Sequence, residues 1–203
     1  MRGTLVGAEL RDSLARDWWV YTQKIAPGVA FLPLPNLGPG LGALAEQLQL
    51  SGLILSGGDS LGDYPERDSS EWALLDWARQ RPTPVLGVCR GLQVLWAHSG
   101  AEVIPCSNTD HRNRQHEVDW LQGWRGVDCA GATWMVNSYH DQQVSQVSPC
   151  YQVLARSRDQ SPEAIAHKDL PWLGIQWHPE RENRDQVLTD ALVMRFLEAC
   201  QHG

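Results

Sequence analysis

The stretch VLGVCRGLQVL, residues 85–95, places one cysteine between two short apolar runs. Residues 84–88 are typical of a buried strand, and residues 91–100 are typical of a helix that ends at Gly100. Gly87 and Gly91 flank Cys89 at a distance of two residues. Glycine lacks a Cβ, so this spacing favours a sharp strand-to-helix turn between closely packed backbones. The stretch therefore predicts a nucleophile elbow that projects the thiol above the C-terminal edge of a sheet.

Short apolar and amphipathic segments alternate on both sides of this turn. Strands are predicted at residues 4–9, 29–34 and 52–58, and helices at 13–25, 41–50 and 69–81, the last capped by Asp68 or Ser69. The second half predicts strands at 116–121, 132–140, 151–157, 163–168 and 173–178, followed by a helix at 185–200. This order predicts one α/β domain over residues 1–203, with a mostly parallel central sheet flanked by helices and antiparallel strands in the C-terminal half.

Composition excludes several classes of protein. The chain has 203 residues, 42% of them hydrophobic, and a formal net charge of −7, which gives no general attraction to nucleic acid or anionic membranes. The first residues lack the apolar core of a signal peptide, and no apolar run is long enough to span a bilayer, so a cytoplasmic protein is expected. The five cysteines are odd in number and form no C-x-x-C pair, which argues against a disulfide framework or zinc knuckle.

A cysteine nucleophile needs a base, and the base needs a group that orients it. His178 ends an apolar strand in LGIQWHPE, and Glu180 follows two residues later, on the same side of an extended chain. Gly57 and Gly58 end another apolar strand, where a backbone N–H can approach an oxyanion. The backbone N–H of the residue after Cys89 is a second oxyanion donor. Three strand ends thus converge on one acyl-transfer site.

Simpler interpretations remain open for these residues. Cys89 could be a buried thiol in a glycine-rich turn, and His178 with Glu180 a surface ion pair. A zinc site from His178, Glu180, His140 and His116 is a further alternative, disfavoured because no pair has the i, i+4 spacing of a helical metal motif. The ten tryptophans are interpreted mainly as packing residues.

The motifs LSGG, GVCRGLQ and WHPE together resemble the class I glutamine amidotransferases, the family that includes the peptidase C26-type gamma-glutamyl hydrolases. The resemblance implies a flavodoxin-like fold and a cysteine hydrolase that releases L-glutamate from a gamma-glutamyl amide through a thioester, without metal or organic cofactor. The implied catalytic residues are Cys89, His178 and Glu180, with oxyanion N–H groups from Gly58 and Arg90. The implied substrate-binding residues are Gly57, Gln93, Asn137, Ser138, Tyr139 and His116.

Within this family, the CRG triplet and PERDSSE (65–71) are typical of free-standing gamma-glutamyl hydrolases. The short chain, LRDSLARDWW (10–19) and HEV (116–118) resemble most the branch that hydrolyses gamma-glutamyl-CDP-amidate in capsular polysaccharide phosphoramidate biosynthesis. A nucleotide diphosphate leaving group needs cations, for which the candidates are Arg11, Arg67, Arg112, Arg114 and His116.

The alternatives are a gamma-glutamyl-gamma-aminobutyrate-type hydrolase, a glutaminase subunit that delivers ammonia to a synthase partner, and a regulatory module without catalysis. The resemblance implies a small-molecule gamma-glutamyl substrate, and the acidic composition predicts no nucleic-acid or membrane partner.

Overall fold

A computed structural model describes residues 2–6, 9–106 and 111–201, with side chains from residue 6 onward. Its main sheet has seven strands in the order β3-β4-β11-β10-β9-β6-β7. The strands are β3 (Leu53–Leu55), β4 (Val85–Val88), β6 (Arg114–Trp120), β7 (Thr133–Ser138), β9 (Tyr151–Ser157), β10 (Pro162–His167) and β11 (Trp172–Ile175). β4 pairs in parallel with β3 and β11, and the remaining pairs are antiparallel. The predicted α/β fold with antiparallel C-terminal strands is confirmed, and the parallel part is its three-stranded core.

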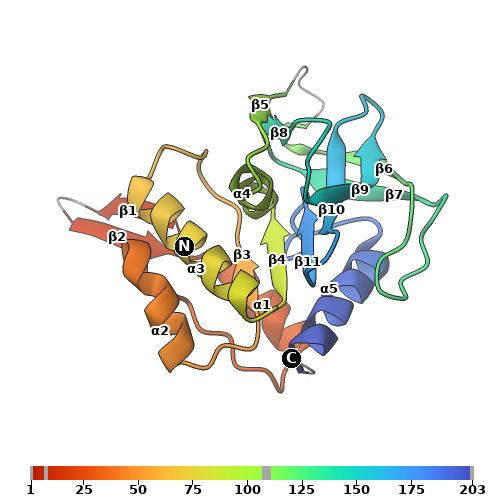
Figure 1. Cartoon of the computed structure of the whole chain (residues 1–203). Helices are drawn as coiled ribbons and strands as arrows, with labels where there is room; N and C mark the ends of the chain where they lie inside the picture. The colour runs from red at the N-terminus through yellow and green to blue at the C-terminus, as the bar shows by residue number, and fades with distance from the viewer. Residues whose placement is uncertain (1, 7–8, 107–110, 202–203) are drawn as a thin grey trace.

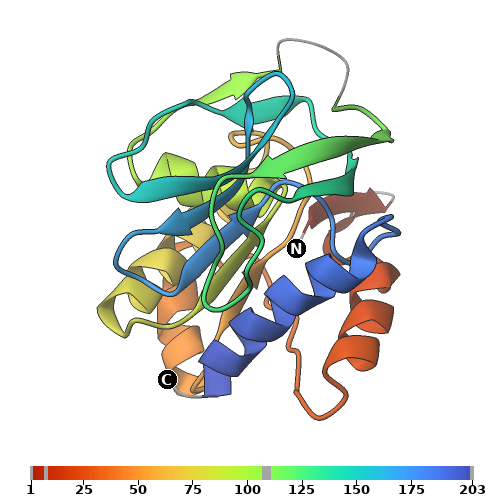
Figure 2. The ribbon, with the colours of Figure 1, turned by 90° about the vertical axis from the view of Figure 1, so that its right-hand side faces the viewer.

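Helices cover both faces of this sheet (Figure 1). α1 (Arg16–Ile25) and α5 (Gln186–Gln201) share one apolar core with β4 and β11. α2 (Leu41–Gln47), α3 (Pro65–Gln80) and α4 (Arg90–His98) enclose the other core. Figure 2 shows α5 crossing the sheet beside α1. The sheet edge that carries the C-terminal ends of β3, β4 and β11 is therefore left for the site.

Smaller elements complete the described chain. β1 (Arg2–Val6) and β2 (Glu9–Ser13) form a separate antiparallel hairpin, and β5 (Val103–Pro105) pairs with β8 (Gln142–Val144). A short 3₁₀ helix, η1 (Gly38–Gly40), leads into α2. All five cysteines are free, as their number and spacing predict. Among the described residues, no helix is long and apolar enough to cross a membrane.

Three predicted elements are wrong in place or kind. Residues 29–34 form no strand, because Pro33 and its neighbour Pro35 lack the N–H that a ladder needs. α3 begins at Pro65 rather than at residue 69, since proline suits the first turn of a helix, and neither Asp68 nor Ser69 is its cap. The strand predicted at 4–9 ends at Val6, with residues 7–8 outside the described part, and residues 9–13 are strand β2.

Candidate active site

Cys89 lies where β4 ends and α4 begins, with φ 53° and ψ −106°. An L-residue adopts this conformation only under strain, which the surrounding backbone must enforce. A Cβ on Gly91 would lie 2.0 Å from the Leu55 carbonyl oxygen, and one on Gly87 would lie 2.6 Å from the backbone of Gly91. The Cys89 N–H donates to the carbonyl of Ile175 at 2.8 Å, which ties the turn to β11. The predicted elbow is present. Gly87 and Gly91 are required because a Cβ at either position would overlap neighbouring backbone atoms.

His178 follows β11 and lies beside the thiol. A Cβ on Gly57 would lie 2.6 Å from His178 Cε1 and 3.5 Å from Cys89 Cβ, so the imidazole and the cysteine border the same glycine. His178 Nδ1 is 2.8 Å from Glu180 Oε1, and the Glu180 side chain is only 1% exposed. Glu180 therefore fixes the ring and leaves Nε2 available for the thiol. The three predicted triad positions come together in space.

Two opposing effects set the charge of His178. Burial disfavours the imidazolium, but hydrogen bonds to Cys89 and Glu180 outweigh it and raise the pKa of His178 to about 9. The imidazole is therefore protonated at neutral pH in the free enzyme. Such an imidazolium stabilises a neighbouring thiolate, the form in which cysteine is nucleophilic.

Asn137 holds the backbone of His178 and is not free to bind substrate through its side chain. Its Oδ1 accepts from the His178 N–H at 2.9 Å, and its Nδ2 donates to the His178 carbonyl at 2.8 Å. Asn183 donates to that carbonyl at 3.0 Å and accepts from the Asn137 N–H at 2.8 Å. The Asn137 side chain is thus engaged in positioning His178, and the substrate contacts predicted for Asn137, partly through its backbone, stay a prediction.

The Gly57–Gly58 peptide is oriented by Arg67 of α3. Arg67 Nη2 donates to the carbonyls of Ser56 at 2.8 Å and Gly57 at 3.1 Å. The C=O and N–H of a trans peptide point in opposite directions, and no described peptide bond is cis. The N–H of Gly58 therefore points away from Arg67. Gly58 has φ 150°, and a Cβ there would lie 2.2 Å from Arg67 Nη1, so only glycine fits.

The Arg90 side chain belongs to the same buried network, here called the α3–α4 ion network. Arg67 Nε donates to Glu71 Oε1 at 2.8 Å. Arg90 donates to Glu71 Oε2 and to Asp68 Oδ1. Both arginine side chains are 2% exposed or less. The network explains CRG and RDSSE as one structural unit, and it corrects the idea that Arg67 is a free cation for phosphate.

Other predicted substrate residues lie around this centre. Gln93 is buried and donates through Nε2 to the Gln142 carbonyl at 2.9 Å. Ser138 is buried and donates to the His111 carbonyl at 2.9 Å, so substrate contacts at this residue would come from its backbone. Tyr139 is 41% exposed, and its ring packs edge-on to His178 with centroids 5.8 Å apart. The Arg181 guanidinium lies 4.7 Å from the centroid of the same Tyr139 ring.

Sequence reasoning missed Gln176, whose Nε2 donates to Cys89 Sγ at 3.8 Å. Its side chain is fully buried and its Oε1 has no hydrogen-bond partner. Gln176 stands two residues before His178, so the alternation that paired His178 with Glu180 could have found it. A donor to sulfur stabilises negative charge on the thiolate.

The remaining predicted cations are not gathered at the triad. Arg11 pairs with Glu9 on the exposed hairpin, and Arg112 pairs with Asp141. His116 Nε2 faces Glu163 Oε2 at 3.5 Å, in a second cluster of histidines. Arg114 lines a cavity of about 370 Å³ beside this cluster. The disfavoured zinc set is not assembled either, because His140 and His116 lie around Glu163 whereas His178 pairs with Glu180.

Comparison with known protein families shows where this chain belongs. The family model of Peptidase C26 matches residues 32–180, which include all the strand ends described above except β1 and β2. The chain belongs to the Peptidase C26 family.

Proteins similar to this chain include two gamma-glutamyl hydrolases. The gamma-glutamyl-gamma-aminobutyrate hydrolase of Escherichia coli O157:H7 is 33% identical over 198 residues, which cover 79% of this chain and 76% of that protein. The gamma-glutamyl-CDP-amidate hydrolase of Campylobacter jejuni is 29% identical over 182 residues, covering 86% of this chain and 84% of that protein. A solved glutamine amidotransferase from Thermotoga maritima has a TM-score of 0.62 at 15% identity, over 82% of this chain and 93% of that one, and so shares the fold.

Proposed function

We propose that this protein hydrolyses gamma-glutamyl amide bonds with Cys89 as nucleophile, His178 as general base and acid, and Glu180 as the group that orients the imidazole. The observation that carries the proposal is the strained Cys89 at the end of β4, beside the His178–Glu180 pair. Membership of Peptidase C26 and the two hydrolase relatives support the same bond class.

The reaction has two halves. The Cys89 thiolate attacks the gamma-carbonyl carbon, and the resulting oxyanion accepts hydrogen bonds from the N–H groups of Gly58 and Arg90. The C–N bond then breaks, His178 gives its proton to the leaving nitrogen, and a gamma-glutamyl thioester remains on Cys89. His178 next takes a proton from water, which attacks the thioester and releases L-glutamate and the thiolate. A single oxyanion donor in such a site contributes about 2.7–4 kcal/mol to transition-state stabilisation.

For the leaving group we favour a phosphorylated amine such as cytidine diphosphoramidate. Arg181 places a cation over Tyr139, next to His178 and therefore next to the nitrogen that leaves. Its side chain is 38% exposed and its Nε lies 3.9 Å from Glu180 Oε1, a long contact that leaves most of the guanidinium available. The relative from Campylobacter jejuni supports this substrate class.

The test is glutamate release by the purified full chain from separate substrates. We expect turnover of gamma-glutamyl-CDP-amidate at a higher kcat/KM than of gamma-glutamyl-gamma-aminobutyrate or L-glutamine. Preference for gamma-glutamyl-gamma-aminobutyrate would keep the bond class and replace the leaving group. Turnover of glutamine alone would support a glutaminase, and no glutamate from any of the three would contradict the proposal.

Arg181→Glu should discriminate among leaving groups. Reversing the charge places a carboxylate where a diphosphate would bind, so KM for gamma-glutamyl-CDP-amidate should rise by about 10-fold or more, as expected for loss of a charge-assisted contact. With gamma-glutamyl-p-nitroanilide, whose leaving group is neutral, KM should change less than about 3-fold. Arg158→Glu, on the exposed pair with Glu117, is the matched control. Equal changes for both substrates would remove Arg181 from leaving-group recognition.

The rate should fall on the alkaline side of pH 9. The His178 imidazolium is present below its pKa of about 9 and is lost above it, and with it the proton that the leaving nitrogen needs. Glu180→Gln removes one of the interactions that raise this pKa, so the alkaline limb of kcat/KM should move to lower pH. Profiles of kcat/KM against pH for both proteins check the prediction, and an unmoved limb would contradict it.

A further inference from the structure

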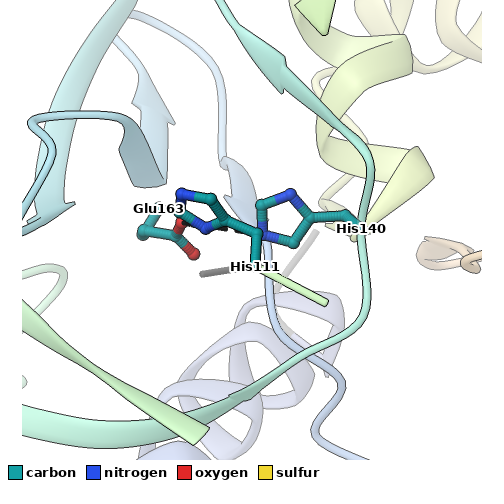
Figure 3. A group of neighbouring side chains, drawn as sticks. All are labelled: His111, His140 and Glu163. Carbon is teal, nitrogen blue, oxygen red and sulfur yellow. Dashed lines mark ion pairs between the residues drawn. The ribbon is translucent and has the colours of Figure 1, made fainter. Parts of the chain in front are cut away.

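Three buried side chains outside the triad converge on one point (Figure 3). His111 precedes β6, His140 follows β7, and Glu163 lies on β10. Glu163 Oε1 is 3.4 Å from His111 Nδ1 and 3.7 Å from His140 Nε2. The three candidate ligand atoms all lie within 4.8 Å of one another. Two imidazoles and a carboxylate therefore lie close enough together to bind one ion.

The inward-facing atoms contact one another as ion pairs but make no hydrogen bond of good geometry. His111 Nδ1, His140 Nε2 and both oxygens of Glu163 are buried and unsatisfied, and so is His116 Nε2, which faces Glu163 Oε2. A folded protein rarely leaves one such group buried without a partner, because each costs about 1–3 kcal/mol. Ion-pair contacts of 3.4 Å, 3.5 Å and 3.7 Å to Glu163 join these atoms, and one shared cation would satisfy all five.

The outer atoms of the imidazoles are held in the way that metal-binding histidines require. His111 Nε2 is 3.0 Å from Asp159 Oδ2, and His140 Nδ1 is 2.9 Å from the Gln142 carbonyl oxygen. A hydrogen bond on the outer nitrogen fixes the ring and leaves the inner nitrogen with its lone pair. Asp159 is itself held by Ser157 and Ser161, at 2.6 Å and 2.7 Å.

We propose that His111 Nδ1, His140 Nε2 and Glu163 bind a divalent transition metal ion, Zn²⁺, in a site separate from the triad. Zn–N and Zn–O bonds of about 2.0–2.1 Å in a tetrahedron place ligand atoms about 3.3 Å apart, close to the carboxylate–imidazole distances above. His116 Nε2 or water supplies the fourth ligand. Two histidines with one carboxylate suit zinc better than the hard ions Mg²⁺ and Ca²⁺.

The position suggests what the ion does. His140 immediately follows Tyr139, and the backbone N–H of His140 donates to the His111 carbonyl at 3.0 Å. An ion joining His111, His140 and Glu163 therefore braces the chain just after β7 against β10. This part of the chain includes Tyr139, whose ring packs against His178. The cavity of about 370 Å³ lined by His111, His116 and Asp159 gives the ion a route from solvent.

Zn²⁺ titration of chelator-treated full chain tests the site, in a Cys89→Ser background so that the catalytic thiol does not bind the ion. We expect one Zn²⁺ per chain with a Kd below about 1 μM. Glu163→Gln, nearly isosteric, should weaken binding at least about 100-fold, and Asp159→Asn, an outer partner, about 10–100-fold. His98→Gln, outside the cluster, is the control and should bind as the background does.

Two further readouts locate and verify the ion. Zn²⁺ should raise the Tm of the Cys89→Ser protein and leave that of its Glu163→Gln variant unchanged. Co²⁺ in the same protein should give a visible d–d spectrum without a sulfur charge-transfer band, because the ligands are nitrogen and oxygen. Absence of stoichiometric binding, or equal binding by the Glu163→Gln variant, would overturn the proposal.

Discussion

Cys89→Ala should lower kcat for glutamate release by about 10⁴-fold or more while leaving the fold intact. Removal of a covalent nucleophile leaves only the contribution of the oxyanion donors and of binding. The side chain is small and the turn is held by the backbone contacts of Gly87 and Gly91, which the substitution does not touch. Steady-state kinetics with a gamma-glutamyl substrate measure the loss of kcat, and far-UV circular dichroism checks that the fold is intact. Residual activity within 100-fold of wild type would remove Cys89 from the nucleophile's role.

Cys89→Gly is the informative companion of this variant. Both lack the thiol and should be equally inactive, but glycine accepts a φ of 53° and a ψ of −106° without strain. Strain of about 1–3 kcal/mol is relieved, and the greater freedom of glycine in the unfolded chain offsets about 0.4–1 kcal/mol of it. The glycine variant should therefore unfold at higher denaturant than the alanine variant. The reverse order would show that the elbow is not strained.

The clustering of the candidate active-site residues could be predicted because these residues follow strand ends. Cys89, His178 and the Gly57–Gly58 pair each end a short apolar run, and parallel strands bring such ends to one edge of a sheet. Glu180 followed from the alternation of an extended chain. The order of the strands in the sheet, which places β11 beside β4, is the one part of this arrangement that local patterns do not give.

The ion network and the histidine cluster could not be predicted in the same way. Arg67 and Arg90 look like surface charges in the sequence, and only the packing of α3 against α4 places Glu71 between them. His111 and Glu163 are 52 residues apart and lie on different hairpins, so no local spacing connects them. The strand predicted at residues 29–34 is wrong for a local reason. An apolar pattern alone does not form a strand when proline removes a hydrogen-bond donor from its ladder.

Glu71→Gln should destabilise the protein by about 3–5 kcal/mol, the cost of removing one partner from a buried ion pair. Glu71 accepts from both Arg67 and Arg90, and its own side chain is 6% exposed. Glutamine keeps the shape but not the charge, so two guanidinium groups lose their shared carboxylate in a place that water does not reach. Asp68 and the carbonyls of Ser56 and Gly57 hold the arginines in place without replacing that charge.

The measurement is the free energy of unfolding from urea denaturation, with Glu66→Gln on the exposed side of α3 as control, expected within about 0.5 kcal/mol of wild type. Folded Glu71→Gln protein should also have a lower kcat, because Arg67 fixes the peptide that presents the Gly58 N–H. A loss of stability below about 1 kcal/mol would show that the network is solvated like a surface pair. If Glu71→Gln lowers kcat without lowering the stability, the effect on catalysis is separate from the effect on folding. The ion network would then act mainly by positioning the oxyanion donors, Gly58 N–H and Arg90 N–H.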